Sequence, residues 1–250
     1  MSSIPAWAAG LDGRTAVVTG GGRGIGRACA LALAEAGADV IAVARTQADL
    51  DTLYAESGGR VRGWAEDVTS DAFLARLEAL PALDVLVNNA GMNRPLPIEQ
   101  VDADTLDAML VLNVRAVYRT SQSAVRAMLR AGRGGSLVHM SSQMGHVGAA
   151  RRTVYCMTKH AVEGLTRAMA VELAPRGIRV NSVAPTFIET DLTRPMFRDE
   201  AFLRSVVDSI PLGRVGRPED VVGAVLFLAS PASALVTGDS LKVDGGWTAR

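Results

Sequence analysis

Seven short runs rich in β-branched residues recur along the chain, and each run predicts a buried strand. A strand in a parallel sheet is covered on both faces, so its residues are apolar nearly throughout rather than at alternate positions. The run Thr-Ala-Val-Val-Thr near the start of the chain is of this kind. The predicted strands occupy 15–19, 39–44, 60–65, 83–88, 136–141, 177–184 and 240–244.

Longer segments between these runs carry apolar residues at three- and four-residue spacing, which predicts amphipathic helices. The two longest predicted helices cover 103–130 and 153–174, and an earlier one begins at Gly24 and ends near Gly37. Strands that alternate with helices in this way are joined by right-handed crossovers and form a parallel sheet with helices on both faces. We therefore predict an α/β fold with a doubly wound, seven-stranded parallel sheet in a single domain, residues 1–250.

The segment 186–217 interrupts this alternation, because it is polar, contains several prolines and has no strand pattern. It follows the sixth predicted strand. Ligands of open α/β sheets bind at the carboxyl ends of the strands, so an insertion at this place lies beside the binding crevice. We expect residues 186–217 to form a substrate lid.

Composition narrows the function classes. The chain has 250 residues, of which 48% are hydrophobic, and its 26 basic residues balance its 26 acidic residues. Without a basic run, the charge pattern of a nucleic-acid or anionic-membrane binder is missing. Residues 1–14 have neither the basic start nor the apolar core of a secretory signal, and no apolar run reaches bilayer length. These features predict a cytoplasmic protein.

The thiols and amines are few. Cys29 and Cys156 are the only cysteines, and neither has metal-ligand residues at a suitable spacing, so no disulfide or metal site is predicted. Lysine occurs only at Lys159 and Lys242, which leaves arginine at 24 of the 26 basic positions. A lysine in this chain therefore indicates a position where arginine does not serve.

The first predicted strand leads directly into the glycine-rich segment 19–26, Thr-Gly-Gly-Gly-Arg-Gly-Ile-Gly, and then into a helix. Glycines let the backbone turn tightly and approach a pyrophosphate, which the N–H groups of a helix N-terminus can bind. The alternative interpretation is a connection that binds no ligand. The flanking strand and helix favour a dinucleotide site.

Seven motifs resemble those of the short-chain dehydrogenase/reductase family in their order and spacing. The resemblance extends nearly end to end and implies a Rossmann-type fold and an NAD(P)-dependent oxidoreductase acting on CH–OH groups. The matching motifs are Thr19-Gly20-x-x-x-Gly24-x-Gly26, Asp67-Val68, Asn88-Asn89-Ala90-Gly91, Asn113, Ser142, Tyr155-x-x-x-Lys159 and Asp244-Gly245-Gly246.

The end of the second predicted strand bears on the choice of nicotinamide cofactor. An acidic residue is expected there when NAD is preferred, but Ala44 and Arg45 occupy the position. Arginine can bind a 2′-phosphate with two parallel hydrogen bonds, and Arg23 adds a second positive charge. We predict that NADP(H) is preferred and that NAD(H) remains possible. The alternative is that Arg45 stacks on the adenine or faces solvent.

The family resemblance implies further cofactor contacts. Asp67 and Val68 are expected at the adenine edge, and Ile188 and Thr190 at the nicotinamide amide and the phosphates. The full implied set is Thr19, Gly20, Arg23, Gly24, Ile25, Gly26, Arg45, Asp67, Val68, Asn89, Ala90, Gly91, Tyr155, Lys159, Ile188 and Thr190.

Tyr155 and Lys159 are four residues apart in a predicted helix and therefore share one face. A free phenol has a pKa of about 10, and a nearby ammonium favours its ionised form. Tyr155 is then expected to exchange a proton with a substrate hydroxyl. Ser142 is expected to hydrogen-bond the reacting oxygen, with Ser141 as the alternative. By resemblance, Asn113 completes the catalytic set by holding a water that links Lys159 to solvent.

Polar residues between Ser142 and Tyr155 are candidates for substrate binding, because this loop lines the substrate pocket in the family that the chain resembles. Gln143 and His146 are candidates for hydrogen bonds to the substrate, and the alternative for His146 is a polar loop residue without that role. Arg152, or alternatively Arg151, is placed to grip a carboxylate, with Arg94 as an assisting group. The competing interpretation is that the two adjacent arginines are solvated.

Within the family, the chain looks most like L-xylulose (dicarbonyl) reductases and related sugar or polyol dehydrogenases, and it shares with the former Pro185-Thr186 in place of the usual Pro-Gly. We therefore expect a polyol, sugar or sugar acid as substrate. The alternatives are a 3-oxoacyl-carrier-protein reductase, a broad carbonyl reductase and, without catalysis, a nucleotide-sensing regulator. Apolar faces on the two long helices predict a homotetramer.

Overall fold

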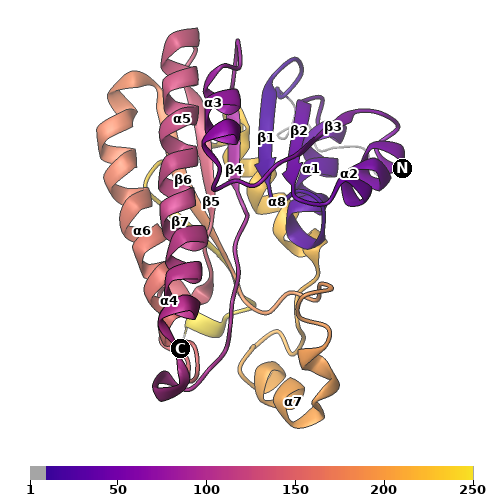
Figure 1. Ribbon diagram of the computed structural model, residues 1–250, viewed down its shortest axis with the longest axis vertical. Coiled ribbons are helices and arrows are strands. Elements are labelled where there is room, and N and C mark those ends of the chain that lie inside the picture. The colour runs from indigo at the N-terminus through magenta and orange to yellow at the C-terminus, as the bar shows by residue number, and fades with distance from the viewer. Residues whose placement is uncertain (1–9, 250) are drawn as a thin grey trace.

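The computed structural model describes residues 10–249, which form a seven-stranded, entirely parallel sheet with helices on both faces (Figure 1). The strand order is β3-β2-β1-β4-β5-β6-β7. Each predicted run overlaps one strand, so the predicted fold class is confirmed. The strands are β1 (Thr15–Thr19), β2 (Asp39–Ala44), β3 (Val61–Ala65), β4 (Val85–Asn88), β5 (Gly135–Met140), β6 (Ile178–Pro185) and β7 (Ser240–Val243).

Helices cover the sheet in two layers. Helices α1 and α8 pack against each other on one face with α2 nearby, whereas α3, α5 and α6 cover the other face (Figure 1). The helices are α1 (Gly24–Glu35), α2 (Gln47–Glu56), α3 (Asp71–Glu78), α4 (Ala103–Leu110), α5 (Ala116–Ala131), α6 (Thr153–Leu173), α7 (Glu200–Asp208) and α8 (Pro218–Ala229).

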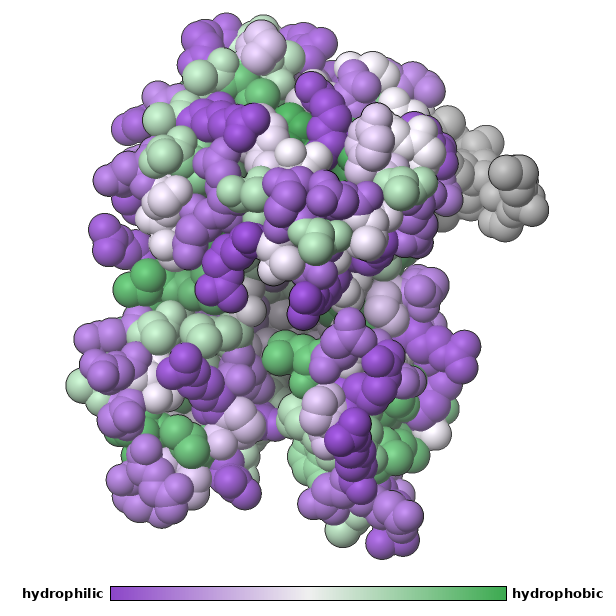
Figure 2. All heavy atoms as spheres, turned by 45° about the vertical axis from the view of Figure 1, so that its right-hand side comes forward, coloured by the Kyte–Doolittle hydropathy of each residue, from purple (hydrophilic) through white to green (hydrophobic). Residues whose placement is uncertain are grey.

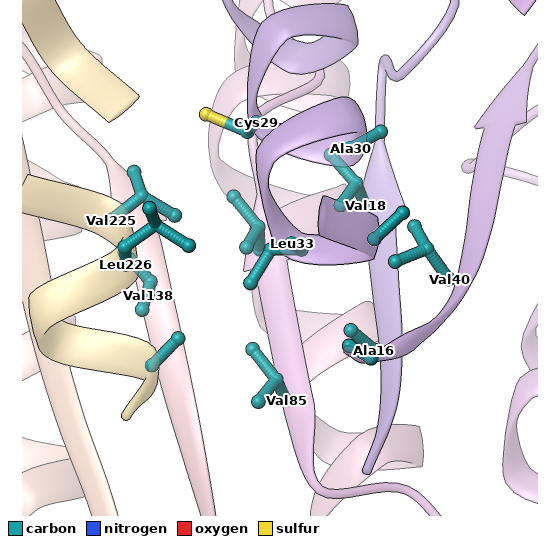
Figure 3. Close-up of a cluster of buried hydrophobic side chains, with 14 of the residues drawn as sticks. Ala16, Val18, Cys29, Ala30, Leu33, Val40, Val85, Val138, Val225 and Leu226 are labelled. Carbon is teal, nitrogen blue, oxygen red and sulfur yellow. The ribbon is translucent and has the colours of Figure 1, made fainter. Parts of the chain in front are cut away.

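Each face of the sheet has its own apolar core. Ala16 and Val18 of β1 point into the cluster beneath α1 and α8, of which Figure 3 shows part, with Leu33 of α1 and Leu226 of α8. Val17, between them in the sequence, points into the opposite cluster beneath α3, α5 and α6. The alternation follows from the two-residue period of a strand. Both clusters are needed because a parallel sheet cannot leave a face to solvent.

The strand order places the binding crevice. Strands β2 and β3 follow β1 in the sequence and lie on one side of it in the sheet, with β3 at the edge. The next strand, β4, pairs with the other side of β1. The connections that leave β1 and β4 therefore diverge, and a crevice opens at their carboxyl ends. Residues that follow these two strands in the sequence are brought together there.

Helix ends agree with the glycine signals, because α1 ends at Glu35 just before Gly37, which has φ +95°. The predicted helix 103–130 differs in one respect. A π-helical segment, Val111–Arg115, joins α4 to α5 and contains Asn113. The segment 186–217 also differs, because it contains the helix α7, which projects from the body of the molecule (Figure 1).

Residues 1–9 and Arg250 lie outside the described residues, and with them most of the segment over which no secretory signal is predicted. Over residues 10–249, no helix is both long enough and apolar enough to cross a membrane. In the same range, His, Cys, Asp and Glu side chains form no group of three or more that is arranged to hold a metal ion.

Candidate active site

A cleft of about 870 Å³ opens at the carboxyl ends of β1, β4, β5 and β6. Figure 2 shows the surface hollowed between two lobes in the lower half of the molecule. The cleft gathers segments that are distant in the sequence. The predicted site residues that line it are Gly20, Arg23, Gly24, Ile25, Arg45, Asp67, Val68, Asn89, Ala90, Gly91, Ser142, Gln143, Tyr155, Lys159, Ile188 and Thr190.

Two residues of the glycine motif hold the loop rather than line the cleft. The Thr19 hydroxyl accepts hydrogen bonds from the backbone N–H groups of Asn89 (3.0 Å) and Ala90 (3.1 Å), which joins the ends of β1 and β4. A Cβ at Gly26 would lie 2.2 Å from the carbonyl oxygen of Gly20. These positions are therefore fixed by packing inside the protein, although the pattern predicts cofactor contacts for both.

The N-terminus of α1 is prepared for an anion. It begins at Gly24, and the side chain of the preceding Arg23 does not cap it. No acidic residue lies in the first turn, so side chains do not satisfy the first N–H groups or oppose a negative charge. Gly20 and Gly24 adopt left-handed φ angles of +65° and +52°, which favour glycine. This cradle fits the pyrophosphate of a dinucleotide.

The two arginines predicted at the adenine end differ in their partners. Arg23 pairs with Asp49, with 2.7 Å between Nε and Oδ2. This ion pair already engages the charge that is predicted to assist a 2′-phosphate. Arg45 is exposed, and within residues 10–249 its side chain makes no hydrogen bond or ion pair. Arg45 is thus the arginine available to a phosphate, while Asp49, which the sequence argument missed, adds a negative charge to the cleft.

Asp67 is fixed at the rim of the cleft beyond β3. Its Oδ1 accepts hydrogen bonds from the backbone N–H (2.8 Å) and the hydroxyl (2.7 Å) of Thr69. These bonds, together with the weaker influence of Arg45, keep the pKa of the carboxyl below its usual value despite some burial. Asp67 therefore presents an ionised acceptor.

Tyr155 lies in the first turn of α6 and faces the cleft. Burial raises the pKa of its phenol to about 12, and it does so against the opposing effects of the Ser142 hydroxyl and the Arg152 charge. The expectation that Lys159 lowers this pKa is not met in the protein alone. The reason is that the Lys159 ammonium lies 5.5 Å from the centre of the tyrosine ring and donates a hydrogen bond elsewhere.

Lys159 is almost fully buried, and its Nζ donates a 2.7 Å hydrogen bond to the carbonyl oxygen of Met140 at the end of β5. Burial lowers the pKa of the ammonium to about 8, although the carboxylate of Glu163 acts to raise it. One helical turn further along α6, Glu163 accepts hydrogen bonds from Ser182 and Ser240. The pKa of Lys159 therefore lies about two units below that of an exposed lysine.

Asn113 has a structural connection that the sequence does not reveal. Its Oδ1 accepts a hydrogen bond from the Met92 N–H (2.9 Å), and its Nδ2 donates to the Met92 carbonyl (2.8 Å) and to the Thr158 hydroxyl (3.2 Å). The side chain thus joins the loop after β4 to α6. Both hydrogens of the Asn113 amide are engaged in these bonds. The water that is expected to link Lys159 to solvent stays a prediction.

Four buried polar side-chain atoms lack a hydrogen-bond partner within residues 10–249, and all four belong to residues that line the cleft. Buried polar groups are otherwise paired almost without exception, so such a concentration marks a place where a ligand completes the bonding. These atoms are Asn93 Oδ1, Ser141 Oγ, Gln143 Nε2 and Thr186 Oγ1. The cleft is therefore suited to a ligand rich in hydroxyl or carbonyl groups.

The remaining predicted substrate residues lie in different environments. His146 is a correction, because its Nε2 lies 2.9 Å from Ser240 Oγ and 3.3 Å from Glu163 Oε1, and the residue does not line the cleft. Arg94 is exposed outside the cleft lining, with its charge near Asp102. Of the adjacent arginines, Arg151 is exposed and Arg152 is buried, and neither belongs to the cleft lining.

Comparisons with known proteins agree with this geometry. A family model described as enoyl-(acyl carrier protein) reductase matches residues 20–248. The L-xylulose reductase of Mesocricetus auratus is 43% identical over 238 residues, or 95% of this chain and 98% of that protein. A 3-oxoacyl-(acyl-carrier-protein) reductase of Vibrio harveyi is 38% identical over 94% of this chain and 98% of its own length.

A solved structure is similarly close. The crystal structure of a gluconate 5-dehydrogenase from Burkholderia cenocepacia, in complex with NADP and tartrate, is 35% identical. It superposes with a TM-score of 0.90 and covers 96% of this chain and 97% of that one. The similarity extends over nearly the whole of both chains, so it includes every element that builds the cleft.

Proposed function

Because the chain belongs to the short-chain dehydrogenase/reductase family, we propose that this oxidoreductase interconverts a secondary alcohol and a ketone of a polyol, sugar or sugar acid. The observation that carries the proposal is the convergence of Ser142, Tyr155 and Lys159 on a cleft that also holds four unpartnered polar atoms. The named activities of the L-xylulose reductase and gluconate 5-dehydrogenase relatives support this substrate range.

The side chains divide the work of the oxidation. The cradle at Gly20 and Gly24 would hold a dinucleotide, whose nicotinamide would supply the hydride acceptor for the carbinol carbon. Tyr155 Oη takes the proton of the substrate hydroxyl, and the Ser142 hydroxyl donates a hydrogen bond to the same oxygen. In the cofactor-bound enzyme, we propose that the Lys159 ammonium, which lies 5.5 Å from the centre of the ring in the protein alone, favours the phenolate by its charge. In the reduction, Tyr155 returns the proton to the oxygen.

We further propose that NADP(H) is the preferred cofactor, with Arg45 binding the 2′-phosphate. Support comes from the exposed, unpaired guanidinium of Arg45 and from the NADP in the related gluconate 5-dehydrogenase structure. We also propose that residues 186–217 act as a lid. Phe187, Ile188 and Leu192 of this segment line the cleft, so its movement would open or close the site.

The activity is tested by a panel assay that follows reduced-nicotinamide absorbance with NADP(H) and NAD(H). The panel contains polyols, sugars, aldonic acids and their keto forms, dicarbonyls and acyl thioesters. Turnover of a polyol, sugar or sugar acid above the other classes supports the proposal. Preferential turnover of acyl thioesters would instead favour the activity named for the Vibrio harveyi relative. Cofactor binding without turnover of any compound would favour a nucleotide-sensing regulator.

The pH dependence of the two directions is expected to differ. Below a phenol pKa of about 12, Tyr155 is protonated, so kcat/KM for reduction stays level until Lys159 loses its proton near pH 8 and then falls. The oxidation needs the phenolate, so its rate increases through the neutral range. Glu163 raises the pKa of Lys159, so Glu163→Gln should move the fall in reduction to lower pH. If the midpoint of the fall in kcat/KM is unchanged in Glu163→Gln, this pH dependence does not come from Lys159.

Assembly and location are proposed from the same features. Exposed apolar side chains occur on α5 and α6, including Tyr118 (52% exposed) and Val171 (80% exposed), and a homotetramer that pairs these helices would cover them. Solution scattering should give a tetramer mass, and a monomer mass would contradict the assembly. We propose a cytoplasmic location, which agrees with the free thiols of Cys29 and Cys156.

A further inference from the structure

Arg152 is a buried cation without an acidic partner. It immediately precedes α6, and its side chain does not cap that helix. The residue is 6% exposed, and within residues 10–249 its guanidinium makes no hydrogen bond and has no carboxylate within ion-pair distance. Removing a charge from water is costly unless a partner compensates for the lost hydration. The burial of Arg152 therefore calls for an anion that the described residues do not supply.

Arg179, which is part-buried, shows how the protein compensates elsewhere for the lost hydration of a guanidinium. Arg179 on β6 donates hydrogen bonds to Ser233 Oγ (2.7 Å), the Leu228 carbonyl (2.9 Å) and the Ser230 carbonyl (3.2 Å). Its donors are thus used to brace the end of α8 against the sheet. The Arg152 guanidinium donates no such hydrogen bonds within residues 10–249, so holding two elements together does not account for its burial.

The position of Arg152 connects it with the reacting groups. It is the residue immediately before α6, and Tyr155 lies three residues later, in the first turn of that helix; Arg152 itself lies behind the cleft lining rather than in it. Its charge is close enough to lower the pKa of the phenol. In the lining of the cleft that Tyr155 faces, the Gln143 Nε2 donor is buried and also lacks a partner within residues 10–249. Two donor groups without partners among the described residues therefore belong to the neighbourhood of the catalytic tyrosine.

The turn before α6 fixes this arrangement. Arg151 has φ +60°, the one left-handed non-glycine residue in the described chain. Its carbonyl accepts a 3.0 Å hydrogen bond from the backbone N–H of Leu96, which ties the turn to the loop after β4. Such a backbone conformation is strained for arginine and persists because its surroundings impose it. It turns the Arg151 side chain to solvent and leaves the Arg152 side chain buried.

We propose that Arg152 binds a carboxylate of the substrate, so that the enzyme prefers sugar acids and their keto forms over neutral sugars and polyols. An arginine fork and a carboxylate match in shape and charge, and Gln143 supplies a further donor for a neighbouring hydroxyl. This inference rests on the proposed function and narrows its substrate class. The tartrate in the related gluconate 5-dehydrogenase structure is a compact carboxylate probe of the same chemistry.

The test compares kcat/KM for an aldonic acid with kcat/KM for the polyol of the same carbon number. Both substrates use Tyr155, so any change in its pKa cancels in the ratio. Arg152→Ala should lower the acid-to-polyol ratio by at least about tenfold, as expected for a lost charge-assisted hydrogen bond. The matched control is Arg151→Asn, because asparagine tolerates the left-handed backbone. This control should leave the ratio unchanged.

A binding measurement keeps the inference testable if the variant folds poorly or turnover is slow. Calorimetric titration of tartrate into the cofactor-loaded enzyme should show binding to wild type and to Arg151→Asn. Binding should be at least about tenfold weaker in Arg152→Ala and in the longer, neutral Arg152→Gln. An unchanged ratio together with unchanged tartrate affinity would overturn the inference while leaving the oxidoreductase function intact. Failure of the proposed function would appear differently, as no hydride transfer to any compound of the panel.

Discussion

Replacing Tyr155 with phenylalanine is expected to lower kcat by at least about 10³-fold in both directions, because the proton acceptor for the alcohol and the proton donor for the ketone are lost together. The ring and its packing remain, so the affinity for NADPH should change by less than about threefold. Steady-state kinetics and fluorescence titration of NADPH measure the two effects separately. A regulator that only senses the nucleotide would bind NADPH in both forms and would have no turnover for the substitution to reduce.

Tyr118→Phe is the matched control for this variant. Tyr118 is on α5, is 52% exposed and does not line the cleft, so the same atomic change there should leave kcat and NADPH affinity at wild-type values. Wild-type turnover in Tyr155→Phe would contradict the assignment of Tyr155 as the group that exchanges a proton with the substrate oxygen. A parallel loss of turnover in Tyr118→Phe would point instead to an effect on assembly.

Replacing Arg45 with aspartate is expected to reverse the cofactor preference, with a fall of about 100-fold in kcat/KM for NADP(H) relative to NAD(H). The substitution removes two charge-assisted hydrogen bonds to the 2′-phosphate, which together correspond to about 3 kcal/mol, and it adds a repelling charge. The same carboxylate can accept hydrogen bonds from the ribose hydroxyls of NAD. The measurement is kcat/KM for both cofactors at a saturating concentration of one substrate.

The neighbouring ion pair supplies an opposite test. In Asp49→Asn, Arg23 loses its charged partner and becomes available to the 2′-phosphate, so kcat/KM for NADP(H) should increase by several-fold. Arg60→Ala is the control, because Arg60 is exposed, its side chain bonds only the carbonyl of Ser57 (2.9 Å) among residues 10–249, and it is not part of the cleft. A cofactor ratio in Arg45→Asp that equals that of wild type would place the 2′-phosphate away from Arg45.

The fold and the members of the cleft follow from short-range patterns. Seven apolar runs gave the strands, and the strand–helix alternation gave a parallel sheet, because sheet burial imposes those patterns on the sequence. The glycine segment and the Tyr155–Lys159 spacing are likewise local. Lys159, one of the two lysines of the chain, is buried and lines the cleft, and its catalytic role stays a prediction.

The features that could not be predicted from the sequence depend on contacts between segments that are distant in the chain. His146 looked like a substrate ligand, but it lies against Ser240, which is 94 residues away in the chain. Arg23 looked free until α2 brought Asp49 beside it. The direction of the Tyr155 pKa shift depends on burial, which exceeds the effects of nearby groups. None of these contacts leaves a periodic signal in the sequence.

The central claim, hydride transfer at the Tyr155 cleft, is tested most directly with NADPH deuterated at the transferable C4 position of the nicotinamide. The enzyme is incubated with this cofactor and the keto forms of sugars and sugar acids, and the products are examined by mass spectrometry. Our account predicts one deuterium on the carbinol carbon of a sugar or sugar-acid product with wild type, and none with Tyr155→Phe. Bound NADPH that transfers no deuterium to any of these ketones with wild type would contradict it.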